Sequence, residues 1–105
     1  MSSAPAQATF VIETTGDHPV VVVAGELDLA NVGQLEASVA GLIDSAEVTH
    51  VDLSGVTFAD SASLGTLVSL HERAVAAGNL LCVSAVSDVI DALFHIAGLS
   101  DVLRC

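Results

Sequence analysis

Apolar runs that alternate with segments of helical periodicity constrain the fold of this 105-residue chain more than any other feature. Residues 20–25 form a β-branched run without polar alternation, which is typical of a central strand covered on both faces. Residues 48–53 and 80–85 are two further predicted strands. Between and after them, residues 31–45, 64–77 and 87–98 carry apolar side chains at helical spacing. This order predicts an α/β domain whose strand-helix-strand units join parallel strands.

The ends of the predicted elements carry the expected capping and turn residues. Asn31 and Ser87 are candidate N-caps, while 78–79 and Gly98 stop the second and third helices. Residues 9–14 form a first strand, and the turn 16–19 predicts that it pairs with the next strand as a hairpin. We therefore expect a mixed sheet of four to five strands with an N-terminal antiparallel strand, and three to four helices, because residues 102–104 are too few to assign.

The apolar stripes of the predicted helices define the expected core, and the domain is expected to span residues 9–105 after a flexible N-terminal tail of residues 1–8. The residues expected to point inward are Val32, Leu35, Val39, Leu42, Ile43, Leu64, Leu67, Val68, His71, Val75, Val89, Ile90, Leu93, Phe94 and Ala97.

The charge balance excludes several classes of partner. Thirteen acidic residues stand against only Arg73 and Arg104, so the formal net charge is -11. Such a chain repels phosphate backbones and anionic lipid, so we expect no direct nucleic-acid binding. The longest apolar stretch, 20–24, is far below the ~20 residues that a spanning helix needs, so no membrane insertion is expected. Cys82 and Cys105 form no CxxC pair, which predicts a reduced cytoplasmic protein with Cys82 as a small core residue.

Polar residues gather after two of the predicted strands. The carboxyl ends of parallel strands meet at one edge of a sheet, where ligands and partners usually bind. The segment 25–31 follows the strand at 20–25, and 54–63 follows the strand at 48–53. If these strands are neighbours, one rim of the sheet collects Glu26, Asp28, Asn31, Asp60, Ser61 and Ser63.

The segment FADSASLG at 58–65 has three chemical interpretations. Asp60 or Ser61 can cap the helix that begins there, and the same helix start can hold a phosphate, which makes the cluster a candidate phosphorylation site. A hydrolase nucleophile is disfavoured because ADSAS lacks the glycines of GxSxG and His71 is expected to be a satisfied core histidine.

Motifs for metal or cofactor chemistry are not found in the sequence. His18, His50, His71 and His95 are scattered without ligand spacing, and there is no HExxH, GxxxxGK[ST] or GxGxxG. We therefore expect no metal, no cofactor and no enzymatic activity.

Three stretches resemble the STAS domains, and most closely the free-standing bacterial anti-anti-sigma factors. They are GELDLANVGQLE at 25–36, VDLSGVTFADSASLGTLV at 51–68 and DALFHIAGLSDVL at 91–103. The resemblance covers 9–104, and its most specific part is a strand ending in DLS followed by FxDSxxLG.

The resemblance implies a phosphorylation-controlled partner switch. The serine after the motif aspartate, here Ser61 after Asp60, would be phosphorylated by an anti-sigma factor with a histidine-kinase-like ATPase fold. The unphosphorylated protein, expected to be a monomer when free, would bind that anti-sigma factor and release a sigma factor, and a PP2C-type phosphatase would reset the cycle. Asp28 and Asn31 would belong to the same binding surface.

The chain departs from the resemblance at one position. Ser63 stands where the family usually has glycine, so Ser63 is an alternative acceptor. A constitutive scaffold, or a regulatory subunit of a transporter or stress-sensing complex, is the alternative function.

Overall fold

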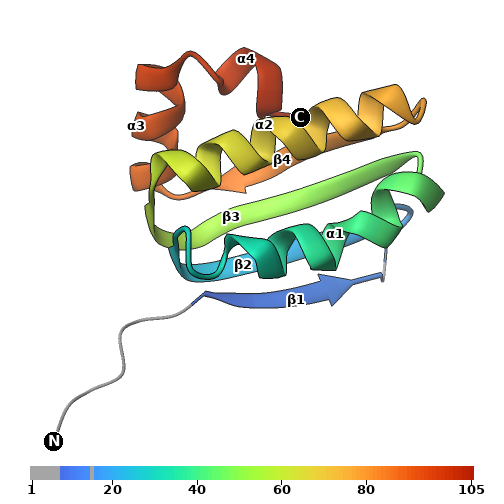
Figure 1. Cartoon of the computed structure of the whole chain (residues 1–105), viewed down its shortest axis with the longest axis horizontal. Coiled ribbons are helices and arrows are strands. Elements are labelled where there is room, and N and C mark those ends of the chain that lie inside the picture. The colour runs from blue at the N-terminus through green and yellow to red at the C-terminus, as the bar shows by residue number, and fades with distance from the viewer. Residues whose placement is uncertain (1–7, 15) are drawn as a thin grey trace, which may run out of the picture.

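The computed structural model describes residues 8–14 and 16–105 and contains one mixed sheet with the strand order β1-β2-β3-β4 (Figure 1). β1 (Thr9–Glu13) pairs antiparallel with β2 (Val20–Leu27). β3 (Val48–Ala59) and β4 (Leu80–Val86) extend the sheet with parallel pairing. The predicted hairpin and the parallel strands are confirmed, whereas residues 1–7 of the predicted tail lie outside the described residues.

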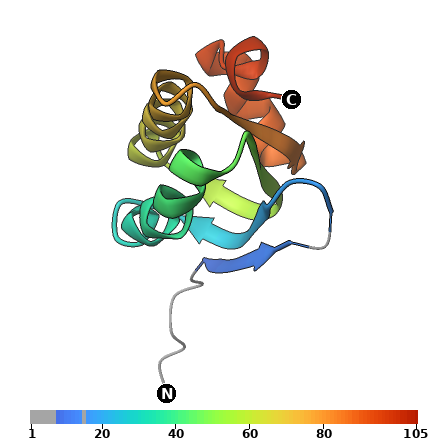
Figure 2. The same ribbon diagram turned by 90° about the vertical axis from the view of Figure 1, so that its right-hand side faces the viewer.

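Two longer helices cover one face of the sheet, and two shorter ones lie together near β4 (Figures 1 and 2). α1 (Val32–Ser45) and α2 (Ser61–Ala76) form the covering pair. α3 (Asp88–Ala97) and α4 (Ser100–Leu103) follow β4. The core lies between these layers and includes the fully buried Val21, Val23, Leu35, Val39, Val51, Leu53, Leu67, Leu70, Leu81, Ile90, Phe94 and Leu103.

The buried stripes of α2 and α3 are narrower than predicted. Val75 and Val89, both expected inside, are 55% and 45% exposed, and Ala97 is also exposed. In α2, Leu70 and Ala74 are buried instead. The buried positions of this helix follow one another at intervals of three or four residues from Ser63, so Val75, one position beyond Ala74, turns away from the sheet.

β3 is longer than the sequence pattern predicted. The sequence pattern predicts that the strand ends at residue 53 and that a loop occupies 54–63, but the strand continues to Ala59 and α2 begins at Ser61. β2 is extended as well, so Glu26 pairs with Phe58 and Leu27 with Ala59. The pairing takes in Gly55, Val56, Phe58 and Ala59, with shifts of register at Ser54 and Thr57, and the strand leads directly to the start of α2.

The predicted helix stops and one predicted cap are confirmed. Gly78 and Gly98 have φ values of 80° and 69°, in the left-handed region that glycine adopts at little cost. The Ser87 hydroxyl accepts a hydrogen bond from the Ile90 N–H at 3.3 Å, as expected of an N-cap. His71 is also satisfied as predicted, since its Nδ1 lies 2.8 Å from the Leu81 carbonyl oxygen.

The prediction of reduced cysteines is wrong for this structure, because Cys82 and Cys105 form a disulfide across 23 residues of sequence. Cys82 is buried as expected, but its sulfur is bonded rather than packed as a free thiol. Sequence spacing does not reveal this pair, because the fold and not a local motif brings the two cysteines together. Within residues 8–14 and 16–105, no helix has the length and apolarity needed to cross a membrane.

Candidate functional site

The candidate site lies where β3 ends and α2 begins. Asp60 has extended backbone angles (φ -94°, ψ 176°), which end the strand and let its side chain turn back over the first turn of α2. Its Oδ1 accepts a hydrogen bond from the Ser63 N–H at 2.9 Å. Asp60 is therefore the N-cap of α2, which confirms one of the two caps that the sequence allowed.

The second oxygen of Asp60 joins α2 to the loop after β2. Asp60 Oδ2 accepts a hydrogen bond from the Leu29 N–H at 3.0 Å, across 31 residues of sequence. The Asp60 N–H also donates to the Leu27 carbonyl oxygen at 3.3 Å. One carboxylate thus holds together the two segments that sequence analysis placed on a common rim.

Asn31 shapes the loop after β2 rather than capping α1 with its side chain. Its Oδ1 accepts from the Asp28 N–H at 2.9 Å, and its Nδ2 donates to the Glu26 carbonyl oxygen at 2.8 Å. Asn31 occupies the N-cap position as predicted, but its side chain makes no cap hydrogen bond to the helix. Because Asn31 is only 9% exposed, its main effect on a partner would be to fix the loop that carries Asp28.

Ser61 and Ser63 have opposite environments, although only one residue separates them. Ser61 is exposed at the first position of α2, whereas Ser63 has no exposed surface. The Ser63 hydroxyl lies 3.0 Å from the Leu27 carbonyl oxygen and 2.8 Å from Asp60 Oδ1, so its proton is shared between two acceptors inside the protein. An enzyme approaching this surface therefore meets Ser61 and not Ser63.

Two apolar side chains beside this cluster were missed by sequence analysis. Leu29 is 74% exposed and lies in the loop held by Asp60, and Phe58 is 47% exposed near the end of β3. Their exposure could have been predicted, because neither residue belongs to an apolar stripe of a predicted helix. These side chains offer apolar area next to polar groups, which a protein partner could bury.

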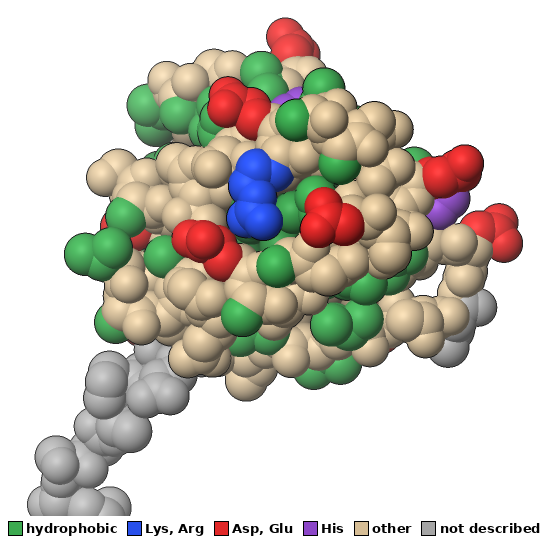
Figure 3. All heavy atoms as spheres, turned by 45° about the vertical axis from the view of Figure 1, so that its right-hand side comes forward, with side chains coloured by type: hydrophobic (Ala, Val, Ile, Leu, Met, Phe, Trp, Pro, Cys, Tyr) green, Lys and Arg blue, Asp and Glu red, His purple; other side chains and the backbone are tan. Residues whose placement is uncertain are grey.

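The electrostatics of the site are dominated by carboxylates. Hydrogen bonds from the Ser63 hydroxyl and then the Ser63 N–H hold the pKa of Asp60 below its ordinary value and outweigh the opposing effect of burial. The Leu29 N–H lowers the pKa further by a smaller amount. Elsewhere, Figure 3 shows acidic side chains spread over one face of the molecule, with basic atoms confined to a small area. At the site itself, the carboxylates of Asp28 and Asp60 suit a partner with basic groups.

Asp60→Ala is expected to lower the free energy of unfolding by about 0.5–2 kcal/mol at neutral pH, the usual cost of losing a helix N-cap. The pKa of Asp60 is lower in the folded protein than in the unfolded chain, where it is about 4. The charged carboxylate therefore stabilises the fold at pH values above about 4, and this stabilisation is lost as the pH falls through the pKa of the folded state. Urea unfolding at pH 7 and in the acid range below pH ~4 measures both effects.

The control is Asp44→Ala, which removes an exposed carboxylate near the end of α1 and should change stability by less than about 0.5 kcal/mol. The assigned role of Asp60 would be contradicted if Asp60→Ala lowered the free energy of unfolding no more than Asp44→Ala does. It would also be contradicted if the loss caused by Asp60→Ala became larger as the pH falls.

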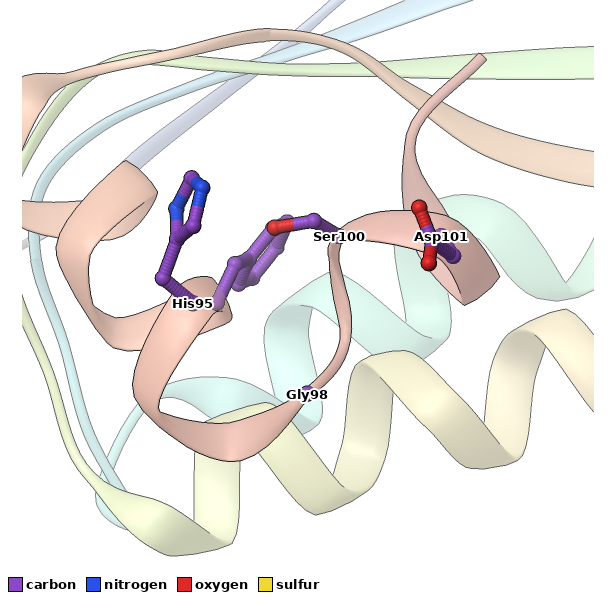
Figure 4. Close-up of a pocket in the computed structure, with 5 residues that line it drawn as sticks. His95, Gly98, Ser100 and Asp101 are labelled. Carbon is purple, nitrogen blue, oxygen red and sulfur yellow. The ribbon is translucent and has the colours of Figure 1, made fainter.

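A cavity lies elsewhere in the described part of the chain. It has a volume of about 230 Å³ and is lined by Phe94, His95, Gly98, Ser100 and Asp101, between α3 and α4 (Figure 4). None of these residues belongs to the Asp60 cluster. The candidate site is thus an exposed surface rather than a pocket, a form that suits a macromolecular partner.

Comparison with known proteins gives one family and a consistent set of relatives. The family model described as "Mlab, STAS domain" matches residues 10–104. The anti-sigma-B factor antagonist of Staphylococcus aureus is 35% identical over 96 residues, covering 89% of each chain. That of Listeria monocytogenes is 32% identical over 93 residues, covering 88% of this chain and 82% of the relative.

Solved structures give the same result for the fold. An anti-sigma factor antagonist from Mycobacterium paratuberculosis superposes with a TM-score of 0.82 at 28% identity, covering 97% of this chain and 87% of the other. SpoIIAA in its unphosphorylated form superposes with a TM-score of 0.77 at 20% identity, covering 91% and 86%. At that identity the likeness to SpoIIAA concerns the fold alone.

Proposed function

Because this chain belongs to the STAS domain family, we propose that it is an anti-sigma factor antagonist whose binding is switched by phosphorylation of Ser61. One observation carries the proposal. Ser61 is exposed directly after the N-cap Asp60, at the start of a helix, while the nearby Ser63 is buried and hydrogen-bonded. The curated relatives are named for antagonism of an anti-sigma factor, which supports the class of partner.

The proposed partner is an anti-sigma factor with a histidine-kinase-like ATPase fold, which would also be the kinase. A PP2C-type phosphatase would remove the phosphate. The proposal places the protein in the cytoplasm, as a monomer when unbound. In the unphosphorylated state, Leu29 and Phe58 would supply apolar contacts at the interface, and the carboxylates of Asp28 and Asp60 would face basic groups of the anti-sigma factor.

The start of α2 can hold a phosphate without unfolding. A phosphate on Ser61 adds a charge of about -1.5 to -2 beside the positive end of the helix dipole, where anions are tolerated. SpoIIAA, whose fold this chain shares, has been solved in both unphosphorylated and phosphorylated forms. The phosphate would therefore act on partner binding more than on the fold, through like-charge repulsion and desolvation beside Asp60 and Asp28.

Phosphate mapping tests the acceptor. Wild type, Ser61→Ala and Ser63→Ala are incubated with ATP and the ATPase-type anti-sigma factor of the same genome, and the modified peptide is identified by mass spectrometry. We expect phosphate on Ser61 in wild type and Ser63→Ala, and none in Ser61→Ala. Thermal melting of each variant confirms that it is folded, since Ser63→Ala removes two internal hydrogen-bond contacts.

Two results would contradict the proposal. Phosphate found on Ser63 would show that the buried serine is exposed to the kinase. Tight binding of the anti-sigma factor with no phosphate on any variant would favour a constitutive subunit that has no switch.

A further inference from the structure

Three potential metal ligands lie together on the sheet, apart from the Asp60 cluster. They are His50 near the start of β3, Cys82 in β4 and Cys105 at the end of the chain. His50 Nδ1 is 3.4 Å from Cys105 Sγ and 3.9 Å from Cys82 Sγ. The three ligand atoms lie within 4.8 Å of one another. The proposed phosphorylation switch uses none of them.

Backbone pairing holds these residues together independently of the disulfide. His50 and Cys82 are register partners on adjacent strands, so their side chains leave the same face of the sheet. At the C-terminus, Arg104 forms a parallel bridge with Val83, and the Cys105 N–H donates to the Val83 carbonyl oxygen at 3.1 Å. Leu103, which is fully buried, anchors this last segment to the core. Breaking the S–S bond would therefore leave Cys105 beside Cys82.

We propose that the reduced chain binds one Zn²⁺ through the sulfurs of Cys82 and Cys105 and Nδ1 of His50. Two thiolates and an imidazole are ligands that Zn²⁺ prefers. Tetrahedral coordination at a Zn–S distance of about 2.3 Å needs the sulfurs about 3.8 Å apart. Rotation of the Cys105 side chain, which is exposed at the end of the chain, provides that separation.

His18 lies close enough to His50 to be a fourth ligand. The ring of His18, in the turn between β1 and β2, lies with its centroid 5.9 Å from that of His50. His18 is partly exposed, so its ring can turn toward a metal held by the other three side chains. The net charge of -11 favours the approach of a cation to the protein. Sequence spacing predicted no such site because the ligands are separated by tens of residues.

The disulfide and the zinc site are mutually exclusive states of the same two cysteines. A dithiol reductant supplies two electrons and two protons, which convert the disulfide to two thiols while the reductant becomes a disulfide. On metal binding each thiol releases its proton to solvent, and each sulfur donates an electron pair to Zn²⁺. Oxidation of the cysteines therefore requires loss of the metal.

Cobalt titration of the reduced full-length chain tests the proposal. The protein is reduced with a phosphine, desalted without oxygen and titrated with Co²⁺, which adopts the same tetrahedral geometry and gives a thiolate charge-transfer absorption. We expect one Co²⁺ per chain, displaced by Zn²⁺. Cys82→Ser, Cys105→Ser and His50→Asn should each weaken binding at least tenfold, and His18→Asn should weaken it less.

The controls separate the site from loss of fold and from nonspecific binding. His95→Asn changes an exposed histidine on α3 and should bind like wild type, and the oxidised wild type should show no charge-transfer band. Circular dichroism confirms that each variant is folded. Unchanged binding in Cys105→Ser or His50→Asn, or Co²⁺ absorption without a thiolate band, would overturn the proposal. Unchanged binding in His18→Asn would overturn the fourth ligand.

Discussion

Replacing Phe94 with alanine is expected to lower the free energy of unfolding by about 3–5 kcal/mol, the largest effect on stability that we predict. Phe94 lies in α3, has no exposed surface and is among the largest fully buried side chains. Truncation removes its apolar contacts within the core and leaves a cavity beneath α3. Since domains are stable by only about 5–15 kcal/mol, this variant should lose a large fraction of its stability and unfold at a markedly lower urea concentration.

Ile96→Ala is the matched control for this prediction. Ile96 lies two residues further along the same helix but is 85% exposed, so its truncation should change stability by less than about 0.5 kcal/mol. Urea unfolding followed by circular dichroism measures both variants. Similar unfolding midpoints for Phe94→Ala and Ile96→Ala would show that α3 does not pack on the sheet as described.

The order of strands and helices could be predicted because it depends on local pattern. The β-branched run of β2 and the glycines after α2 and α3 determine strand type and helix ends through side-chain shape and backbone freedom. The end of β3 could not, because Ser54, Gly55 and Thr57 resemble a loop locally. The strand continues because Gly55 and the residues 56, 58 and 59 pair with 24–27 of β2, while Ser54 and Thr57 lie at two shifts of register.

The sequence was enough to predict which residues lie at the candidate site, but not what each of them does there. Parallel strands bring Asp28, Asn31 and Asp60 to one rim, which follows from topology. Some of these side chains point into the protein and others point outward, and residue type alone does not tell which do which. Asn31 and Ser63 are turned inward to hold the loops, while Ser61 and Leu29 are turned outward. The disulfide escaped prediction for a similar reason, since Cys105 reaches Cys82 only through the packing of α4 and the Arg104 bridge.

Ser61→Asp is expected to weaken binding of the ATPase-type anti-sigma factor at least 100-fold, or about 2.7 kcal/mol. The added carboxylate would stand at the start of α2, next to Asp60 and on the same rim as Asp28, in a surface that must lose water on binding. Because aspartate carries less charge than a phosphate, the modified protein should bind more weakly still. Ser61→Ala removes only a hydroxyl and should bind within about threefold of wild type.

Ser69→Asp is the control that separates position from charge. Ser69 is exposed two turns further along α2, so this variant has the same net charge and the same helix but an unchanged rim, and it should bind nearly as wild type does. Isothermal titration calorimetry with the purified anti-sigma factor measures the affinity of all four proteins.

If charge repulsion weakens binding, added salt should restore part of the affinity of Ser61→Asp, because exposed charges are screened over about 10 Å at 0.1 M salt. Equal weakening by Ser61→Asp and Ser69→Asp would mean that overall charge governs binding, and wild-type affinity in Ser61→Asp would remove the physical basis of the switch.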